Sequence, residues 1–179
     1  RLSSANSINW GRLVPQIVYY FAAYVQLLKA GKIAFGDEVD FCVPTGNFGD
    51  ILAGYYAKRM GLPVGKLVCA SNENNVLTDF LTTGTYTAKR EFFKTTSPSM
   101  DILVSSNLER LLCHVTGSDA EVAGLMKSLS ETGSYTVRPE TLAAIQQTFS
   151  CGWSSEAEVA GEIRARYEKD DYLCDTHTA

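Results

Sequence analysis

The residues best able to do chemistry lie together in one loop, Pro44-Thr45-Gly46-Asn47-Phe48-Gly49-Asp50. An apolar segment with the pattern of a strand precedes this loop, and a segment with the pattern of a helix follows it. Glycines allow a backbone to approach a ligand closely and to adopt dihedral angles that other residues avoid. The start of a helix presents unpaired N–H groups and the positive end of its dipole, which suits a phosphate group. The loop therefore predicts a phosphate site, although an ordinary tight turn between strand and helix would use the same residue types.

Other kinds of chemical site have less support in the sequence. The loop lacks the lysine of a P-loop and the glycine spacing of the dinucleotide fingerprint. With only two histidines, His114 and His177, no Ser-His-acid or Cys-His arrangement is identifiable. No two of the five cysteines form a C-x-x-C pair, so we expect reduced thiols and neither a disulfide framework nor a metal site.

The elements that must position the loop alternate between helix and strand. We expect helices at about 8–30, 47–60 and 75–84, and strands at 38–43 and 66–70. In the first helix the apolar residues Val14, Ile17, Val18, Phe21, Val25 and Leu28 share one face, and Pro15 marks a kink or a later start. This alternation predicts a three-layer α/β fold with a mostly parallel sheet and flanking helices.

The second half of the chain has weaker patterns. Residues 86–99 are polar and read as a connecting segment, and we expect strands at 100–104 and, with weaker support, at 134–137. Helices are predicted at 107–115, 119–132, 140–147 and from Ser154 or Ser155 to about Lys169. Ser118 is the expected cap of the second of these helices, with Glu121 at capping-box spacing.

The composition limits the classes of protein to which the chain can belong. Its 179 residues are 45% hydrophobic and 20% charged, which is ordinary for a globular protein. The net charge of −4 and the scattered basic residues give no support for nucleic-acid binding. No apolar run approaches the ~18 residues of a membrane span, and no secretory signal is present. These features, with the reduced thiols, lead us to expect a cytoplasmic protein.

The sequence at both ends of the chain is typical of a truncated domain. The chain begins at Arg1 and ends at Asp175-Thr176-His177-Thr178-Ala179, where Asp175 has the pattern of a helix N-cap. We therefore expect residues 1–179 to be an internal fragment of one larger domain, truncated at both termini.

Several segments together resemble threonine synthases, which are fold-type-II pyridoxal-phosphate enzymes related to the tryptophan synthase β chain. The loop at 44–50 resembles the loop that holds the cofactor phosphate in that family. The other similar segments are 6–10, 62–64, 71–75, 100–107, 109–111 and 175–179. The last of these has Thr176 where the family usually has proline, and it contains His177, whose role is unassigned.

The resemblance implies a cofactor, a substrate and a set of contacts. The cofactor is pyridoxal 5'-phosphate, and the parent enzyme is a lyase that converts O-phosphohomoserine and water to threonine and phosphate. The residues implied to bind the cofactor phosphate, mainly through backbone amides, are Gly46, Asn47, Phe48, Gly49 and Asp50. Because a carboxylate does not attract phosphate, Asp50 is expected to cap the helix or to orient the loop. Asn6, Asn9 and Asn72 are candidate substrate contacts.

The resemblance also implies that essential groups lie outside the chain. In the family, the lysine that forms the Schiff base precedes this segment, and the threonine that pairs with the pyridine nitrogen follows it. We therefore expect the fragment to be inactive alone. Two alternatives stay open: another fold-type-II lyase or synthase with the same loop, and a non-catalytic α/β binding domain. Oligomerisation is compatible with all three.

Overall fold

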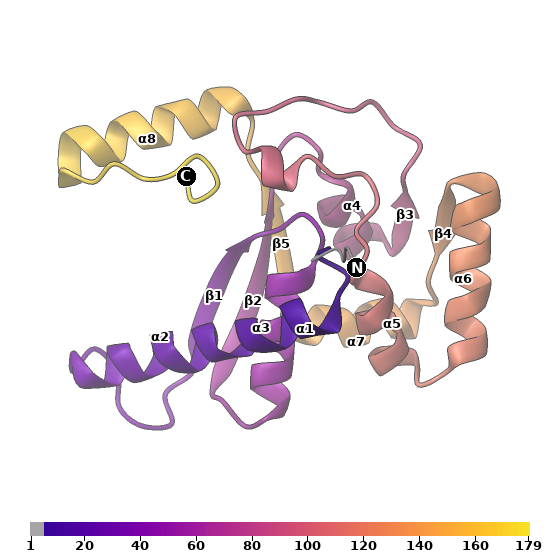
Figure 1. The fold of residues 1–179 in the computed structure, drawn as a ribbon, viewed down its shortest axis with the longest axis horizontal. Coiled ribbons are helices and arrows are strands. Elements are labelled where there is room, and N and C mark those ends of the chain that lie inside the picture. Colours follow the sequence, from indigo (N-terminus) through magenta and orange to yellow (C-terminus); the bar gives the residue numbers. More distant parts are fainter. Residues whose placement is uncertain (1–5) are drawn as a thin grey trace, which may run out of the picture.

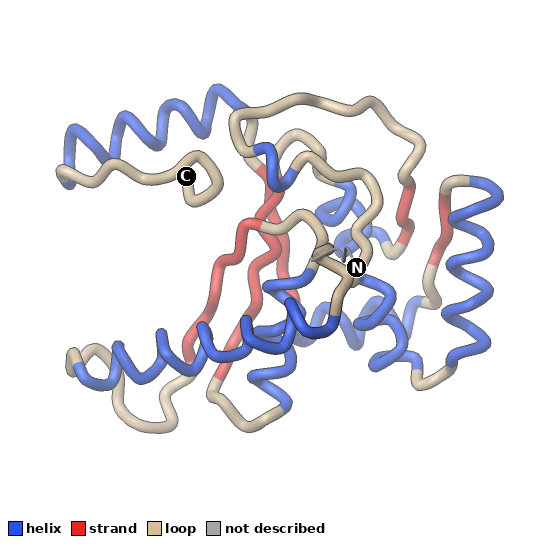
Figure 2. Tube along the Cα trace, in the orientation of Figure 1, coloured by secondary structure: helices blue, strands red, loops and turns tan. Residues whose placement is uncertain are grey.

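The computed structural model describes residues 6–179, and its centre is a small parallel sheet surrounded by helices (Figures 1 and 2). The first half contains α1 (Trp10–Leu13), the 3-10 turn η1 (Val14–Gln16), α2 (Ile17–Lys29), β1 (Val39–Pro44), α3 (Gly49–Arg59), β2 (Val64–Ser71) and α4 (Val76–Thr83). The second half contains β3 (Thr85–Thr87), the 3-10 turn η2 (Pro98–Met100), α5 (Leu108–Thr116), α6 (Asp119–Thr132), β4 (Ser134–Thr136), α7 (Pro139–Thr148), β5 (Phe149–Trp153) and α8 (Glu156–Asp170).

The main sheet has the strand order β1-β2-β5, and all its strands are parallel. Cys69 in β2 pairs with Val43 on one side and with Cys151 on the other. Strands β3 and β4 form a separate antiparallel ribbon. The α/β class, the mostly parallel sheet and the flanking helices predicted from the sequence are confirmed.

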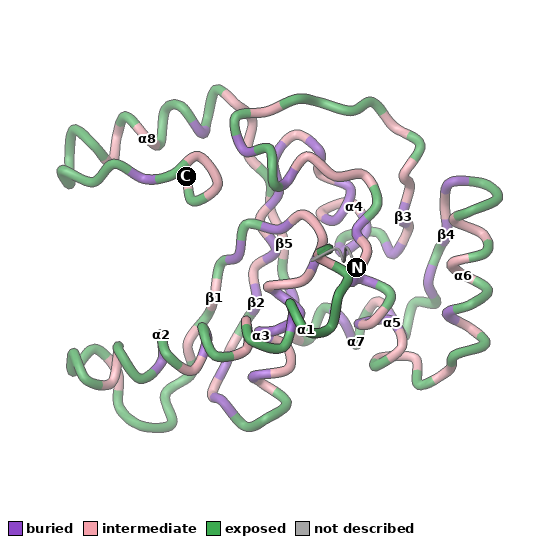
Figure 3. Tube along the Cα trace, in the orientation of Figure 1, coloured by how far each residue is buried: buried purple, intermediate pink, exposed green. Residues whose placement is uncertain are grey.

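One face of the sheet carries the hydrophobic core. In Figure 3, buried residues occur along the sheet strands and α3, whereas α8 is mostly exposed. Val43, Leu67, Cys69 and Phe149 alternate along their strands and pack with buried side chains of α3, α4, α5 and α7. The opposite face carries the intervening residues, which line a cavity of about 530 Å³ together with Val159 of α8 and residues 176–179. Within residues 6–179, the cavity therefore lies between the second face of the sheet and the part of the chain formed by α8 and residues 176–179.

The sequence analysis assigned the strands less well in the second half of the chain. The strand predicted at 100–104 is wrong, because Met100 ends a 3-10 turn and residues 101–104 have no strand pairing. Strand β5 was not predicted. Its five residues, Phe-Ser-Cys-Gly-Trp, follow α7 without an intervening turn, so no loop signal separates the strand from the helix.

The apolar face predicted for the first helix is only partly correct, because Ile17, Phe21 and Leu28 pack against the core whereas Val14, Val18 and Val25 are exposed. Pro15 lies in the 3-10 turn that joins α1 to α2, but Val18 is 62% exposed and Val25 42% exposed. The buried residues of α2 are Tyr20 and Tyr24. The ring of Tyr20 packs against Phe41, and each tyrosine hydroxyl has a backbone hydrogen-bond partner, so both amphipathic rings are buried with their polar ends satisfied.

Two predicted helix caps are present. Ser118 accepts a hydrogen bond from the Glu121 backbone N–H at the start of α6, and Ser155 forms a reciprocal capping box with Glu158 at the start of α8. The Glu121 carboxylate does not complete a capping box, since it accepts hydrogen bonds from Arg138 at 2.8 and 3.1 Å. Among residues 6–179, no helix has both the length and the apolar character that crossing a bilayer requires.

Candidate anion-binding site at the end of β1

The loop between β1 and α3 lies at the carboxyl end of a parallel strand, where open α/β sheets bind ligands (Figure 1). The first backbone hydrogen bond of α3 runs from Leu52 N to Phe48 O at 3.2 Å. The N–H groups of Gly49, Asp50 and Ile51 precede this bond, and a helix provides such amides with no internal acceptor. The start of α3 therefore offers three backbone donors to an anion.

Phe48 adopts the backbone conformation that we expected of a glycine. It is the N-cap of α3 and has φ 60° and ψ 12°, in the left-handed region, whereas neither Gly46 nor Gly49 lies in that region. The left-handed conformation costs roughly 1–2 kcal/mol for a residue with a Cβ. The Phe48 ring is 1% exposed and packs against Phe149 with ring centroids 5.5 Å apart. Burial of a phenylalanine contributes about 1.5–3 kcal/mol, which offsets the backbone strain.

Gly46 is required for space. A Cβ on Gly46 would lie 2.5 Å from the Ser99 carbonyl oxygen and 3.1 Å from Ile102 Cδ1. On Gly49, a Cβ would come no closer than 3.5 Å to its nearest neighbour, the Asn107 amide. The two glycines of the loop therefore differ in role, and only Gly46 permits a close backbone approach.

Residues 105–107 hold the loop from one side. The Ser105 hydroxyl donates to Gly46 O at 2.7 Å, and Asn107 donates to Asn47 O from its backbone at 3.1 Å and from its side chain at 3.0 Å. In a trans peptide the N–H points away from the carbonyl of the same peptide group. Because the carbonyls of Gly46 and Asn47 face residues 105–107, the N–H groups of Asn47 and Phe48 point to the other side of the loop.

A cavity of about 200 Å³ lies at the loop. Its lining residues are Ser7, Arg12, Gln16, Pro44, Thr45, Gly46, Asn47, Phe48, Gly49, Asp50, Ile51 and Ser99. Two of these residues, Arg12 of α1 and Gln16 of η1, come from the segment that precedes the sheet. The sequence analysis did not select these two residues, because one arginine in an aromatic-rich segment gives no local signal. The positive charge of an arginine and the positive end of the α3 dipole both favour an anionic ligand.

Asp50 lies in the first turn of α3, where the helix dipole favours an acidic side chain. It does not cap the helix, because Phe48 occupies the N-cap position and α3 has no side-chain cap, so that expectation was wrong. The Tyr20 hydroxyl donates to the backbone carbonyl of Asp50 at 2.8 Å. Burial raises the pKa of the Asp50 carboxyl group, and the nearby Tyr20 hydroxyl partly opposes this shift. Its Oδ1 atom is buried and has no hydrogen-bond partner among residues 6–179.

Asn6 and Asn9 form local hydrogen bonds. The Asn6 side-chain Oδ1 accepts from Ile8 N at 3.2 Å, and Asn9 caps α1 with its Oδ1, which accepts from Gly11 N at 2.8 Å. Neither is among the residues of the described chain that line the cavity at the loop. A contact of either asparagine with a substrate stays a prediction.

Asn72 lies in a dense polar network at the end of β2. Its amide nitrogen donates to Thr95 Oγ1 at 2.8 Å, to Ser97 Oγ at 3.0 Å and to Asp101 Oδ1 at 2.9 Å. The side-chain oxygen of Asn72, Oδ1, accepts from Asn74 N at 2.9 Å. The side chain is buried beside the larger cavity, so its donors are used within the protein, and a contact with substrate stays a prediction.

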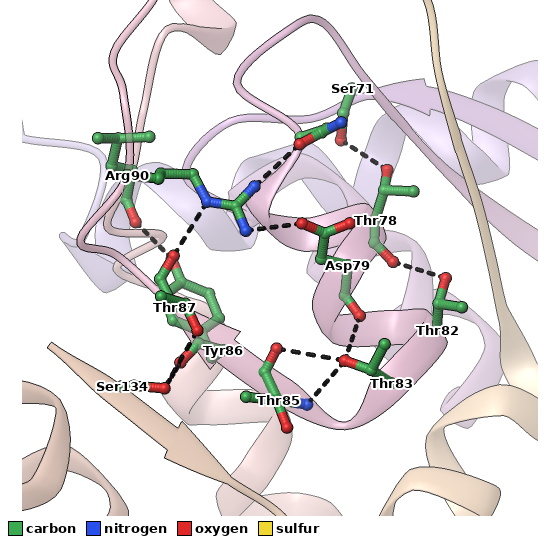
Figure 4. Close-up of polar contacts among 12 residues, drawn as sticks. Ser71, Thr78, Asp79, Thr82, Thr83, Thr85, Tyr86, Thr87, Arg90 and Ser134 are labelled. Carbon is green, nitrogen blue, oxygen red and sulfur yellow. Dashed lines mark hydrogen bonds and ion pairs between the residues drawn. The ribbon is translucent and has the colours of Figure 1, made fainter.

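The connecting segment 88–101 is held near both ends. At its start, Arg90 donates to Asp79 at 2.6 Å, to Asn75 at 2.9 Å and to the Thr87 carbonyl at 3.2 Å (Figure 4). At its end, the Asp101 carboxylate accepts hydrogen bonds from the backbone N–H and the hydroxyl of Thr95. It also accepts from the side-chain amides of Asn72 and Asn74. Burial would raise the pKa of Asp101, but these hydrogen bonds together lower it. The segment thereby places Ser99 against Gly46.

Other sites are absent from the described part of the chain. Among residues 6–179, no group of three or more His, Cys, Asp or Glu side chains is arranged to hold a metal ion. No lysine of residues 6–179 lines the cavity at the loop. Lys58 donates to the carbonyls of Val64 and Gly65, and Lys66 donates to those of Gln146 and Gln147.

Comparison with known proteins identifies the family of this arrangement. No protein-family model matches the chain. The human protein named threonine synthase-like 1 is 48% identical over 99% of the chain, and threonine synthase of Schizosaccharomyces pombe is 43% identical over 99%. The structure of a PLP-bound threonine synthase from Brucella melitensis superposes on 98% of the chain with a TM-score of 0.92 and 50% identity. The chain spans 24%, 38% and 37% of the lengths of these three proteins. In sequence and in fold, the chain is similar to a segment of these threonine synthases.

Proposed function

We propose that this chain forms the cofactor-phosphate half of the active site of a threonine synthase. The parent enzyme would convert O-phosphohomoserine and water to L-threonine and inorganic phosphate with pyridoxal 5'-phosphate as cofactor. The observation that carries the proposal is the loop at 45–48 together with the start of α3, whose backbone amides adjoin a cavity that Arg12 also lines. The 50% identity to a PLP-bound threonine synthase supports it.

The residues present fit the phosphate group of that cofactor. The amides of Asn47, Phe48, Gly49 and Asp50 are donors suited to phosphate oxygens, and Gly46 supplies the close approach in the loop backbone. Arg12 on the wall supplies positive charge.

The work of this chain in the reaction is binding and orientation. When bound, the cofactor supplies a conjugated ring that withdraws electrons from the substrate. The loop amides and Arg12 would anchor one end of the cofactor, which fixes the position of its ring relative to the substrate. Residues 105–107 bind the carbonyls of Gly46 and Asn47 by hydrogen bonds. These two carbonyl oxygens would therefore point away from the phosphate oxygens.

The Schiff-base lysine is proposed to come from outside these 179 residues. Lys58 and Lys66 donate to backbone carbonyls of residues outside the loop. The isolated chain is therefore proposed to be inactive. We also propose a cytoplasmic location, which the five free cysteines support.

The test uses the full-length parent protein with pyridoxal phosphate and O-phosphohomoserine, while threonine and phosphate are measured together. Equal yields of the two products are expected. A protein that binds the cofactor but releases no phosphate would show a different fold-type-II lyase or synthase. Absence of both cofactor binding and turnover would favour a non-catalytic binding domain.

A further inference from the structure

The C-terminal segment of the chain lies along the connecting segment beside the loop. The Thr176 hydroxyl donates to Thr96 O at 2.7 Å, and the Ser99 backbone N–H donates to His177 Nε2 at 3.3 Å. Residues 176 and 177 therefore contact residues 96 and 99, which are distant in sequence.

The hydrogen bonds define the tautomer of His177. Nε2 accepts from a backbone N–H, so it carries no proton in this arrangement. Nδ1 lies 2.9 Å from Asp175 Oδ1 and therefore carries the proton that it donates to the carboxylate. The same oxygen accepts from the His177 backbone N–H at 2.7 Å. Asp175 thus orients the ring so that Nε2 faces Ser99.

Ser99 connects His177 to the loop. It belongs to the turn η2, lines the cavity of about 200 Å³, and its carbonyl oxygen lies 2.5 Å from the position of a Cβ on Gly46. The N–H of Ser99 faces His177 while its carbonyl faces Gly46. A displacement of this turn would therefore change the space available to the loop backbone.

We propose that His177 is a positioning residue for the phosphate site. By accepting the Ser99 N–H, the neutral imidazole holds the turn Pro98–Met100 against Gly46, and this contact keeps the loop amides directed at the anion. Among residues 6–179, His177 is not one of those that line the cavity at the loop; it acts through Ser99. The inference rests on the proposed function in one respect, namely that the anion is the phosphate of pyridoxal phosphate.

The experiment compares two substitutions of His177 in the full-length protein. The side-chain oxygen of glutamine reaches the position of Nε2, whereas the shorter asparagine reaches only the position of Nδ1. Affinities of the cofactor-free protein for pyridoxal phosphate and for pyridoxal, which lacks the phosphate, are measured by calorimetry. His177→Asn is expected to weaken binding of pyridoxal phosphate about tenfold and to leave pyridoxal binding unchanged, since one hydrogen bond is lost. His177→Gln is expected to retain the affinity of the wild type.

Thr176→Val is the matched control, because it removes the neighbouring hydrogen bond between the same two segments and leaves Ser99 untouched. It is expected to keep the preference for the phosphorylated ligand. Amide hydrogen exchange of the cofactor-free wild type provides a test without substitution: the Ser99 N–H should be protected, and rapid exchange there would overturn the proposal.

Three outcomes separate this inference from the proposed function. If the wild type binds pyridoxal phosphate and pyridoxal equally well, the proposed phosphate site is contradicted, and so is the role of His177. A wild type that prefers pyridoxal phosphate, with the same preference in His177→Asn, would overturn only the role of His177. Equal weakening of both ligands by His177→Asn, or loss of the preference in a folded His177→Gln protein, would also overturn it.

Discussion

Phe48 and Phe149 pack with ring centroids 5.5 Å apart, and this contact joins the start of α3 to the first residue of β5. The strained residue of the loop is thereby anchored on the main sheet. The contact explains how a left-handed backbone conformation is kept at a residue other than glycine, next to the amides that face the proposed anion.

Substitution of Phe48 should separate the contribution of its ring from the strain of its backbone. Phe48→Ala loses the buried ring and keeps the Cβ, so we expect a loss of about 3–5 kcal/mol in the free energy of unfolding. Phe48→Gly also loses the ring but removes the left-handed penalty, so it should be the more stable variant by about 1 kcal/mol. Urea unfolding of both variants measures the difference, and a less stable glycine variant would contradict this account.

The two loop glycines should respond differently to alanine. In Gly46→Ala the new methyl group overlaps the Ser99 carbonyl, so we expect a loss of about 1–3 kcal/mol in unfolding free energy. Gly49→Ala meets only ordinary contacts and gains helix propensity, so its stability should stay equal or rise by up to about 1 kcal/mol. Denaturation of the cofactor-free protein tests both, and equal losses would show that the Ser99 contact is unimportant.

Asp50→Asn should stabilise the protein at neutral pH. The folded-state pKa of Asp50 is raised above its ordinary value of 3.8, so the folded state favours the protonated carboxyl group. The associated stability is complete below the ordinary pKa and is lost as the pH rises through the folded-state pKa. The asparagine variant avoids this loss, and its melting temperature should exceed that of the wild type at pH 7 and approach it near pH 3. A variant less stable at pH 7 would show that the carboxylate has a partner.

Asp101→Asn should have the opposite dependence on pH. The folded-state pKa of Asp101 is lowered from 3.8, so its stabilising effect is present above that value and is lost as the pH falls through the folded-state pKa. The amide nitrogen of asparagine cannot accept the hydrogen bonds that one carboxylate oxygen receives. We expect a lower melting temperature than that of the wild type at pH 7 and a smaller gap at pH 3. A gap that widens in acid would be inconsistent with the network described for Asn72.

Much of the first half of the fold and two helix caps of the second half could be predicted, because their signals are local. The β1–loop–α3 unit follows from an apolar run, a glycine-bearing turn and a helical pattern, and Ser118 and Ser155 cap helices as expected. The orientation of α2 could not be predicted, since tyrosines that bury their rings and satisfy their hydroxyls compete with valines for the core.

The remaining site features depend on contacts between distant segments. The left-handed conformation of Phe48 depends on Phe149, and the need for glycine at position 46 depends on Ser99. Arg12 enters the cavity wall only because α1 lies beside the loop in the folded chain. None of these relationships has a pattern within a short window of sequence.

The sheet order has a consequence for how the chain reaches its native state. Cys42 pairs with Val68 after a single intervening helix, whereas Val68 pairs with Ser150 only after the whole segment from α4 to α7. Because closing a longer loop costs more entropy, the β1–α3–β2 unit should assemble early and β5 should join it late. The Phe48 ring gains its partner on β5 only at that second step. The loop between β1 and α3 would therefore exist as a flexible turn during refolding and become rigid when the last strand docks.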